Sequence, residues 1–148
     1  MDFSIRIATK ADYLEIMRIW LEGSQLAHPF LDEEELAYQK EEIETKYLGE
    51  VEMWVAETEE KQILGFIGLI DNFIGGLFVD PAHHHQGIGT KLVLWARELK
   101  KEPLEVDVFL GNEGARKFYN TLDFLTEFES IFDGKSSNYT QFHMIQYQ

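Results

Sequence analysis

Short stretches of alternating apolar and polar residues recur along the chain, and this alternation is the pattern of half-buried β-strands. The clearest stretch spans residues 104–110, where apolar side chains alternate with Glu105 and Asp107. A turn at Asp133-Gly134-Lys135 separates the last two stretches. Together with continuous apolar runs, this pattern predicts strands over residues 4–8, 51–57, 62–70, 73–79, 104–110, 124–131 and 139–147.

Elsewhere apolar residues recur at steps of three and four, which is the spacing of one helix face. Tyr13, Ile16 and Trp20 share such a face. The pair Thr9 and Asp12 before them can act as a capping box. The next helix is acidic at its start, which suits the positive end of the helix dipole. The predicted helices run from Thr9 to about Gly23, from Asp32 to about Lys46, and over residues 86–100 and 113–122.

The order of these elements predicts the fold. The strand at 73–79, the helix at 86–100 and the strand at 104–110 form a crossover unit, so the two strands should be parallel. The remaining neighbours can form hairpins. We therefore expect an α/β (α+β) protein, with a mixed, mostly antiparallel seven-stranded sheet, a central parallel pair and about four helices on both faces. Gly75 and Gly76 allow a bulge in the first parallel strand.

Composition fits a single domain covering residues 1–148, because 45% of the chain is hydrophobic and no repeat or linker interrupts it. The absence of cysteine excludes a disulfide framework and a thiol nucleophile. The N-terminus lacks a signal-peptide pattern, and the longest apolar run, residues 63–70, is too short to span a membrane. A cytoplasmic location is therefore expected.

The formal net charge is −14, which repels phosphate backbones and anionic lipids. We therefore expect neither nucleic acid nor a membrane as a partner. A cationic amine would be attracted, but keeping the protein in solution is the simpler explanation of the acidity.

Residues 76–96 carry the first candidate chemistry. An apolar strand stops at Asp80-Pro81, and a helix follows a polar turn that contains Gly87 and Gly89. The free amides of a helix start suit a phosphate, and glycine lets the backbone approach it closely. Two glycines alone also fit a plain turn, because neither a three-glycine nucleotide fingerprint nor a Gly-Lys-Ser/Thr loop is present.

A second motif follows the strand at 104–110. Asn112 is a favoured helix N-cap, and Ala115, Phe118, Tyr119 and Leu122 follow at helical spacing. The motif runs on to Phe124, where the next strand begins.

Together the segments 84–89 and 112–124 resemble the GNAT N-acetyltransferase superfamily. The family patterns are Arg/Gln-x-x-Gly-x-Gly/Ala and Asn-x-x-Ala-x-x-Phe-Tyr-x-x-Leu-Gly-Phe. The whole chain is most similar to the small, single-domain bacterial members, especially the YjaB-like group. Two positions depart from the patterns, since His84 replaces Arg or Gln and Asp123 replaces the Gly before the final Phe.

The resemblance implies that acetyl-CoA is the co-substrate. The amides of residues 87–90 would hold its pyrophosphate, and the backbone of Phe78 and Val79 would pair with the pantetheine arm as a strand does. Asn112 would contact pantetheine, cap its helix, or do both. The cofactor-binding residues expected are Phe78, Val79, His84, Gln86, Gly87, Ile88, Gly89, Thr90 and Asn112.

Direct attack of an amine on the thioester in a ternary complex needs a positioned donor, a polarised carbonyl, a neutral amine and a protonated leaving thiolate. By resemblance Tyr119 is the general acid, although its spacing alone also fits a core aromatic residue. The general base is left open between His28, Asp71 and water. His28 follows the first helix and titrates in a suitable range, but a lone loop histidine is as often a plain surface residue.

The acceptor is a primary amine, either a small molecule or a protein or peptide amine. Its pocket draws on four large side chains that core packing explains equally well: Trp20, Phe30, Met53 and Trp54. No metal is expected, because adjacent side chains in the run His83–His85 point apart and no second cluster completes a ligand set. The alternatives are a non-catalytic acyl-CoA-binding or sensing module and, less favoured, an unrelated phosphate-binding domain. Monomer and homodimer both remain open.

Overall fold

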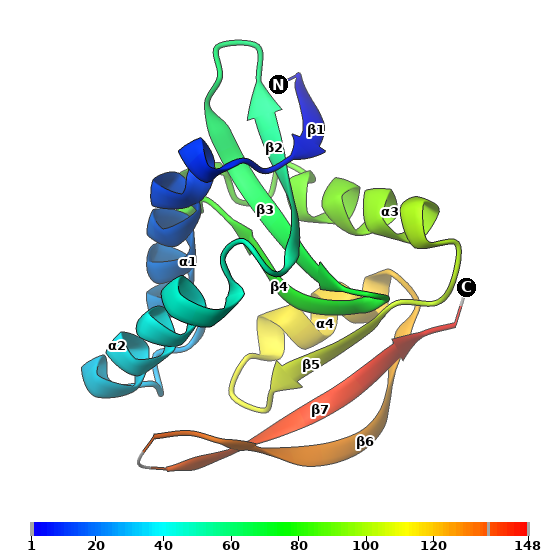
Figure 1. The fold of residues 1–148 in the computed structure, drawn as a ribbon. Coiled ribbons are helices and arrows are strands. Elements are labelled where there is room, and N and C mark those ends of the chain that lie inside the picture. The colour runs from blue at the N-terminus through cyan, green and yellow to red at the C-terminus, as the bar shows by residue number, and fades with distance from the viewer. Residues whose placement is uncertain (1, 136, 148) are drawn as a thin grey trace.

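The computed structural model describes residues 2–135 and 137–147. Within this part, seven strands form one sheet in the order β1-β2-β3-β4-β5-β7-β6 (Figure 1). The strands are β1 (Phe3–Ile7), β2 (Glu52–Thr58), β3 (Ile63–Ile70), β4 (Phe73–Val79), β5 (Glu105–Phe109), β6 (Phe124–Asp133) and β7 (Asn138–Gln146). The α-helices are α1 (Tyr13–Ala27), α2 (Glu33–Glu42), α3 (Ile88–Lys100) and α4 (Glu113–Thr121). The predicted fold class is confirmed.

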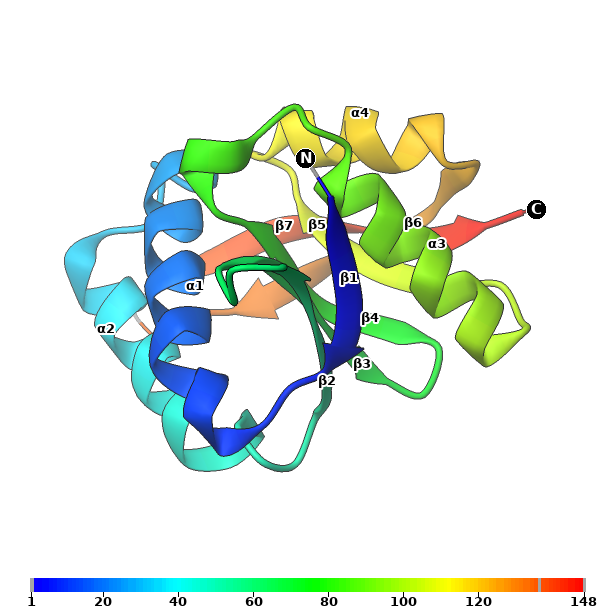
Figure 2. The same cartoon turned by 90° about the horizontal axis from the view of Figure 1, so that it is seen from above.

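Helices cover both faces of the sheet, with α1 and α2 on one side and α3 and α4 on the other (Figure 2). Each pair of helices buries its own cluster of apolar side chains against the strands. On the first side Ile16 and Trp20 of α1 pack with Phe66 of β3. On the second, Leu92 of α3 packs with Val106 of β5. In the described residues no helix is long and apolar enough to cross a membrane.

Several helix ends differ from those expected. α1 continues past Gly23 to Ala27, because the glycine marks close packing: a Cβ there would lie 2.9 Å from the Phe78 ring. Asp32 caps α2 as predicted by accepting the N–H of Glu35 at 2.8 Å. However, the last part of that segment, Ile43–Tyr47, is a π-helical turn. α3 begins at Ile88, two residues later than predicted.

The parallel pair β4–β5 is confirmed, but it is paired only at its beginning. The two matched positions are Phe73 with Glu105 and Ile74 with Val106, after which the strands diverge. The register between β3 and β4 shifts at Gly75, which has no partner between Ile74 and Gly76. The bulge allowed by the glycine pair is therefore present, and it lies where the parallel pairing stops.

We predict that Gly65→Ala lowers the free energy of unfolding by about 1–3 kcal/mol, the usual cost of overpacking. A Cβ at residue 65 would lie 2.8 Å from the Phe78 carbonyl oxygen and 3.2 Å from the Val79 Cα, so strand β4 would have to move. Gly76→Ala is the control, because its nearest neighbour lies at 3.7 Å. Urea unfolding measures both, and an equal effect would contradict close β3–β4 packing as the cause.

Candidate active site

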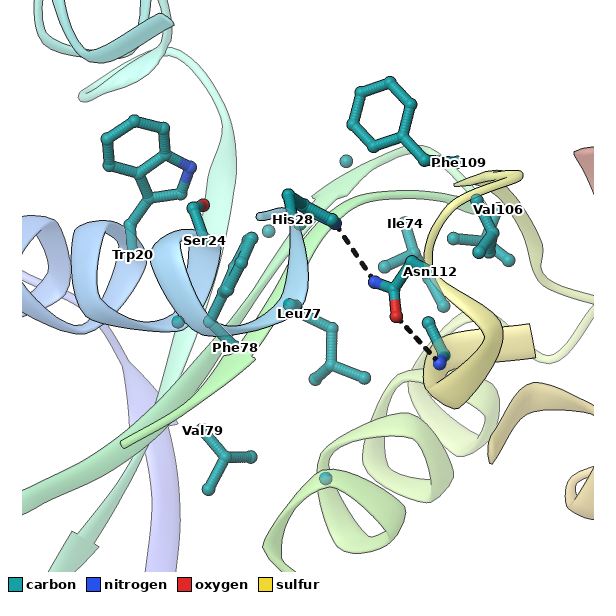
Figure 3. A pocket seen from close by; sticks show the side chains of 18 of the residues that line it. Trp20, Ser24, His28, Ile74, Leu77, Phe78, Val79, Val106, Phe109 and Asn112 are labelled. Atoms are coloured by element: carbon teal, nitrogen blue, oxygen red, sulfur yellow. Dashed lines mark hydrogen bonds between the residues drawn. The ribbon is translucent and has the colours of Figure 1, made fainter. Parts of the chain in front are cut away.

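A cleft of about 1550 Å³ opens where β4 and β5 diverge (Figure 3). Both strands, the starts of α3 and α4, and parts of α1 and α2 line it. In the close view Leu77 and Val79 lie on the β4 wall, and Trp20 and His28 stand on the side of α1. Among the described residues no lysine or arginine lines this cleft.

The backbone of β4 presents free polar groups to the cleft. The Asp80 N–H donates to the Leu64 carbonyl at 2.8 Å, which fixes the alternation of backbone groups along the strand. Phe78 therefore turns its N–H and C=O toward β3, whereas Leu77 and Val79 turn theirs toward the gap. Of the two strand residues predicted to pair with pantetheine, Val79 is suitably oriented. Phe78 is not, whereas Leu77 is oriented in the same way as Val79.

The start of α3 closes one end of the cleft with backbone amides. Gly87 is its N-cap, with φ = +79°, and no side chain caps it within the described chain. The first amides of the helix, which include those of Ile88 and Gly89, therefore have no helical partner. A Cβ on Gly89 would lie 3.4 Å from the Phe118 ring, so this glycine lets α3 approach α4. Gly87 has open space around its Cβ position, where a ligand can approach.

The histidine run before α3 supports the loop. His84 Nε2 donates to the Val79 carbonyl at 3.1 Å, so its side chain binds the end of β4. His83 Nε2 lies 3.2 Å from the amide nitrogen of Gln62 instead. His83, His84 and His85 all line the cleft, whereas Gln86 does not and is exposed. Within the described residues no group of three His, Cys, Asp or Glu side chains is placed to hold a metal ion.

Buried Asp80 anchors the first turn of this loop. Its carboxylate accepts the Ala82 N–H at 3.1 Å and Nη2 of Arg18 at 2.8 Å. The loop before α3 is thereby tied to the middle of α1.

Asn112 joins the start of α4 to the end of α1. Its Oδ1 accepts the Ala115 N–H at 3.1 Å, which confirms the predicted cap, and its Nδ2 donates to Nε2 of His28 at 3.0 Å. His28 Nε2 is therefore the unprotonated ring nitrogen. Burial against Phe109 and the surrounding chain lowers the His28 pKa to about 4. The loop histidine expected near the surface is instead a packed, neutral residue whose lone pair is engaged.

Tyr119 lines the cleft from α4 and is otherwise buried, with 5% of its surface exposed. Its ring contacts Phe118 and Phe124 at centroid distances of 5.1 and 5.0 Å. Burial raises its pKa above the ordinary value, which keeps the phenol protonated. In the described chain the hydroxyl has no hydrogen-bond partner, so it is free to donate to a ligand.

The far side of the cleft is apolar and open. Trp20 and Met53 line it, as the sequence allowed. Trp54 does not, since it packs on Trp95 at 5.3 Å. Phe30 lies behind the wall, 5.5 Å from the ring of Phe109. The base candidate Asp71 is exposed in the β3–β4 turn and does not line the cleft.

A clasp between α2 and the β6–β7 turn completes this wall. The Glu35 side chain, 1% exposed, accepts the Lys135 N–H at 2.8 Å and the Gln39 amide at 3.2 Å. The Lys135 ammonium also lies 2.9 Å from Glu34. The hairpin is thus held beneath α2, as Figure 1 shows.

The chain matches the model of the acetyltransferase (GNAT) domain over residues 49–125. It is 32% identical to the peptidyl-lysine N-acetyltransferase YjaB of Escherichia coli over 124 residues, which cover 84% of this chain and 83% of that protein. The solution structure of apo-form YjaB from Escherichia coli superposes with a TM-score of 0.88 at 29% identity, covering 98% of this chain and 97% of that one. The PaiA N-acetyltransferase of Thermoplasma acidophilum, solved with coenzyme A, shares the fold with a TM-score of 0.81 at 21% identity and full coverage of both chains.

A mixed sheet opened by one splayed parallel pair, with a helix start facing the gap, defines an acyl-CoA-dependent class of transferase. The chain belongs to the GNAT acetyltransferase family. It is accordingly an N-acetyltransferase with acetyl-CoA as its co-substrate.

We predict that Gly87→Ala weakens acetyl-CoA binding by at least about tenfold, because a Cβ would project into the open space beside the α3 amides. Gly49→Ala is a matched control: it imposes similar strain, at φ = +89°, but does not line the cleft. Isothermal titration calorimetry measures affinity, and thermal unfolding measures the strain. Equal affinities of the two variants would show that strain alone is responsible.

We also predict that His28 titrates near pH 4 in the folded protein, well below its ordinary value of 6.5. Between these values the native state binds fewer protons than the unfolded chain, so the histidine's contribution to stability is lost as pH falls. NMR of the imidazole measures the titration, and His28→Gln should flatten this part of the stability profile. A His28 pKa near 6.5 would contradict the burial described above.

Proposed function

We propose that the protein, as a single domain of residues 1–148, transfers the acetyl group of acetyl-CoA to the primary amine of a lysine side chain in a peptide or protein. The observation that carries this proposal is the free backbone of β4, which faces the gap between the α3 start and Tyr119. Similarity to a peptidyl-lysine N-acetyltransferase at 32% identity supports the choice of acceptor. The amine attacks the thioester directly while both substrates are bound.

Donor positioning comes first. The amides at Gly87, Ile88, Gly89 and Thr90 receive the pyrophosphate, and the backbone of Leu77 and Val79 pairs with pantetheine as an added strand. His84 supports pyrophosphate binding only indirectly, because its ring N–H is already hydrogen-bonded to the Val79 carbonyl. Holding the thioester in one orientation converts a bimolecular encounter into an oriented reaction.

Tyr119 then acts on the leaving group. As the tetrahedral intermediate collapses, the carbon–sulfur bond breaks and the Tyr119 hydroxyl gives its proton to the CoA sulfur. A raised pKa suits this task, since the phenol stays protonated until a thiolate forms. The acceptor nitrogen loses its remaining surplus proton, which restores the phenol.

His28 is better suited to positioning than to base catalysis. Its lone pair accepts a hydrogen bond from Asn112, and its low pKa makes it a weak proton acceptor. We therefore assign it the task of orienting Asn112, and through it the α4 start. A direct contact of Asn112 with pantetheine would require its amide to leave these partners.

The test is acetylation of lysine peptides by the purified protein, followed by mass spectrometry and by release of the CoA thiol. Acetylated lysine supports the proposal. Acetyl-CoA binding without transfer to any amine would contradict it and identify a binding module.

We predict that Tyr119→Phe lowers the single-turnover rate about 10²–10⁴-fold, because only the proton donor is removed. Acetyl-CoA affinity and thermal stability should stay near the parent values, since the described chain offers the hydroxyl no hydrogen bond to lose. Phe118→Leu is the control for ring packing, because Phe118 contacts Tyr119 without carrying a donor. A Tyr119→Phe protein with the parent rate would remove Tyr119 from the mechanism.

A further inference from the structure

Strand β5 presents a carboxylate at the point where the parallel pairing ends. Its residues alternate between two faces: Val106 and Val108 point into the core with α3 and α4, so Asp107 points toward the opposite face. The last matched pair of β4 and β5 is Ile74 with Val106. Asp107 is therefore the first β5 residue beyond the ladder, beside the bulge at Gly75.

A cationic side chain holds this carboxylate in place. His143 of β7 lies with Nδ1 2.7 Å from Asp107 Oδ1 and with Nε2 2.7 Å from Glu105 Oε1. Carboxylate oxygens can only accept, so both ring nitrogens donate and the imidazole carries a positive charge. Partial burial alone would lower the His143 pKa, but the hydrogen bonds to Glu105 and Asp107 outweigh it and raise the pKa.

The imidazolium is itself sandwiched between aromatic rings. Phe128 of β6 stacks on it at 4.6 Å and Phe73 of β4 at 6.4 Å, each with an interplanar angle of 8°. The ring is thereby fixed in the plane that presents Nδ1 to Asp107. One positive charge between two carboxylates leaves the group with a net negative charge.

The second oxygen of Asp107 is available to a ligand. In the described chain Oδ2 has no hydrogen-bond partner, and the side chain lines the cleft with 28% of its surface exposed. Glu42, Glu113 and Asp133 are the other carboxylates on the cleft wall; the Lys46 ammonium lies 2.9 Å from Glu42, and no lysine or arginine among the described residues lines the cleft itself. A positive charge that enters the cleft from solvent therefore meets a wall that, among the described residues, carries carboxylates but no lysine or arginine of its own.

We infer that Asp107, oriented by His143, receives the ammonium group of the lysine acceptor beside the thioester and accepts one of its protons. The inference rests on the proposed function. An N–H bond of the ammonium breaks, an O–H bond forms on Asp107 Oδ2, and the electron pair stays on nitrogen for the attack. The transfer leaves a neutral amine, which is the form that attacks the thioester. The proton then leaves through the open acceptor side to water.

The experiment compares two acceptors with the intact enzyme: a lysine peptide, and the same peptide with a terminal hydrazide in place of the ammonium. The hydrazide is neutral at pH 7 and needs neither the ion pair nor the first deprotonation. We expect Asp107→Asn to lower kcat/KM for the lysine peptide by at least about 10²-fold. The rate with the hydrazide peptide and the acetyl-CoA affinity should each stay within about threefold of the parent, because neither uses that proton.

Matched variants separate charge from structure. Asp133→Asn removes another carboxylate of the cleft wall and should leave both acceptors nearly unchanged. Asp107→Glu keeps the carboxylate and should recover part of the lysine activity. His143→Gln leaves the carboxylate but releases its orientation, so it should raise KM for the lysine peptide more than for the hydrazide. This variant supplies the same comparison if Asp107→Asn does not fold.

The outcomes distinguish the two levels of the hypothesis. Wild-type enzyme that acetylates neither peptide would overturn the proposed function and this inference with it. Wild-type enzyme that acetylates lysine, with an equally active Asp107→Asn variant, would overturn only the role of Asp107. An equal loss with both acceptors would show that residue 107 supports the fold rather than the ammonium.

Discussion

The active-site cleft depends on a hydrogen-bonded ladder that stops early. Two strands that run in parallel normally satisfy each other's backbone along their length, but β4 and β5 do so only to Ile74 and Val106. Beyond that point Leu77 and the N–H of Val79 offer backbone groups to the gap that have no partner in the described chain, while the Val79 carbonyl accepts from His84. Backbone groups left without protein partners need water or a ligand. A ligand that supplies its own amides in an extended line is the natural complement, and the pantetheine arm has that form.

Several structural features border the gap between β4 and β5. The bulge at Gly75 interrupts the β3–β4 register where the parallel pairing stops, and the apolar clusters on both faces contain side chains of β4 and of β5. Side chains then tie the rim together: Arg18 holds Asp80 at the start of the phosphate loop, and Asn112 holds His28 across the other end. These bonds tie α1 to the loop before α3 and to the start of α4. The acceptor side is built from segments distant in the chain, which are α1, α2 and the β6–β7 turn.

Sequence periodicity predicted the sheet and its parallel pair, because local alternation and crossover geometry decide them. Sequence periodicity failed at positions whose structure is decided by contact with a segment distant in the chain. A glycine at position 23 is typical of a helix end, but here it lies inside α1. The Phe78 ring on β4 packs so close to it that a larger side chain would not fit. Which backbone groups of β4 face the gap depends on the β3 register, so Phe78 was chosen where Leu77 is the better oriented residue. Tyr119 and the α3 loop were singled out as candidates by the family resemblance rather than by spacing. His28 could not be understood before its bond to Asn112, 84 positions away, was known.

The clasp at Glu35 sets an order in which the acceptor wall can form. Its bond to the Lys135 N–H joins positions 100 residues apart, so most of the chain must be made before α2 can be fixed to the hairpin. Until then the Glu35 carboxylate has to stay hydrated, because burying it without that partner is costly. During synthesis from the N-terminus, the phosphate loop and α3 emerge well before the turn that carries Lys135. The segments of the donor side are thus made before the turn that completes the acceptor wall.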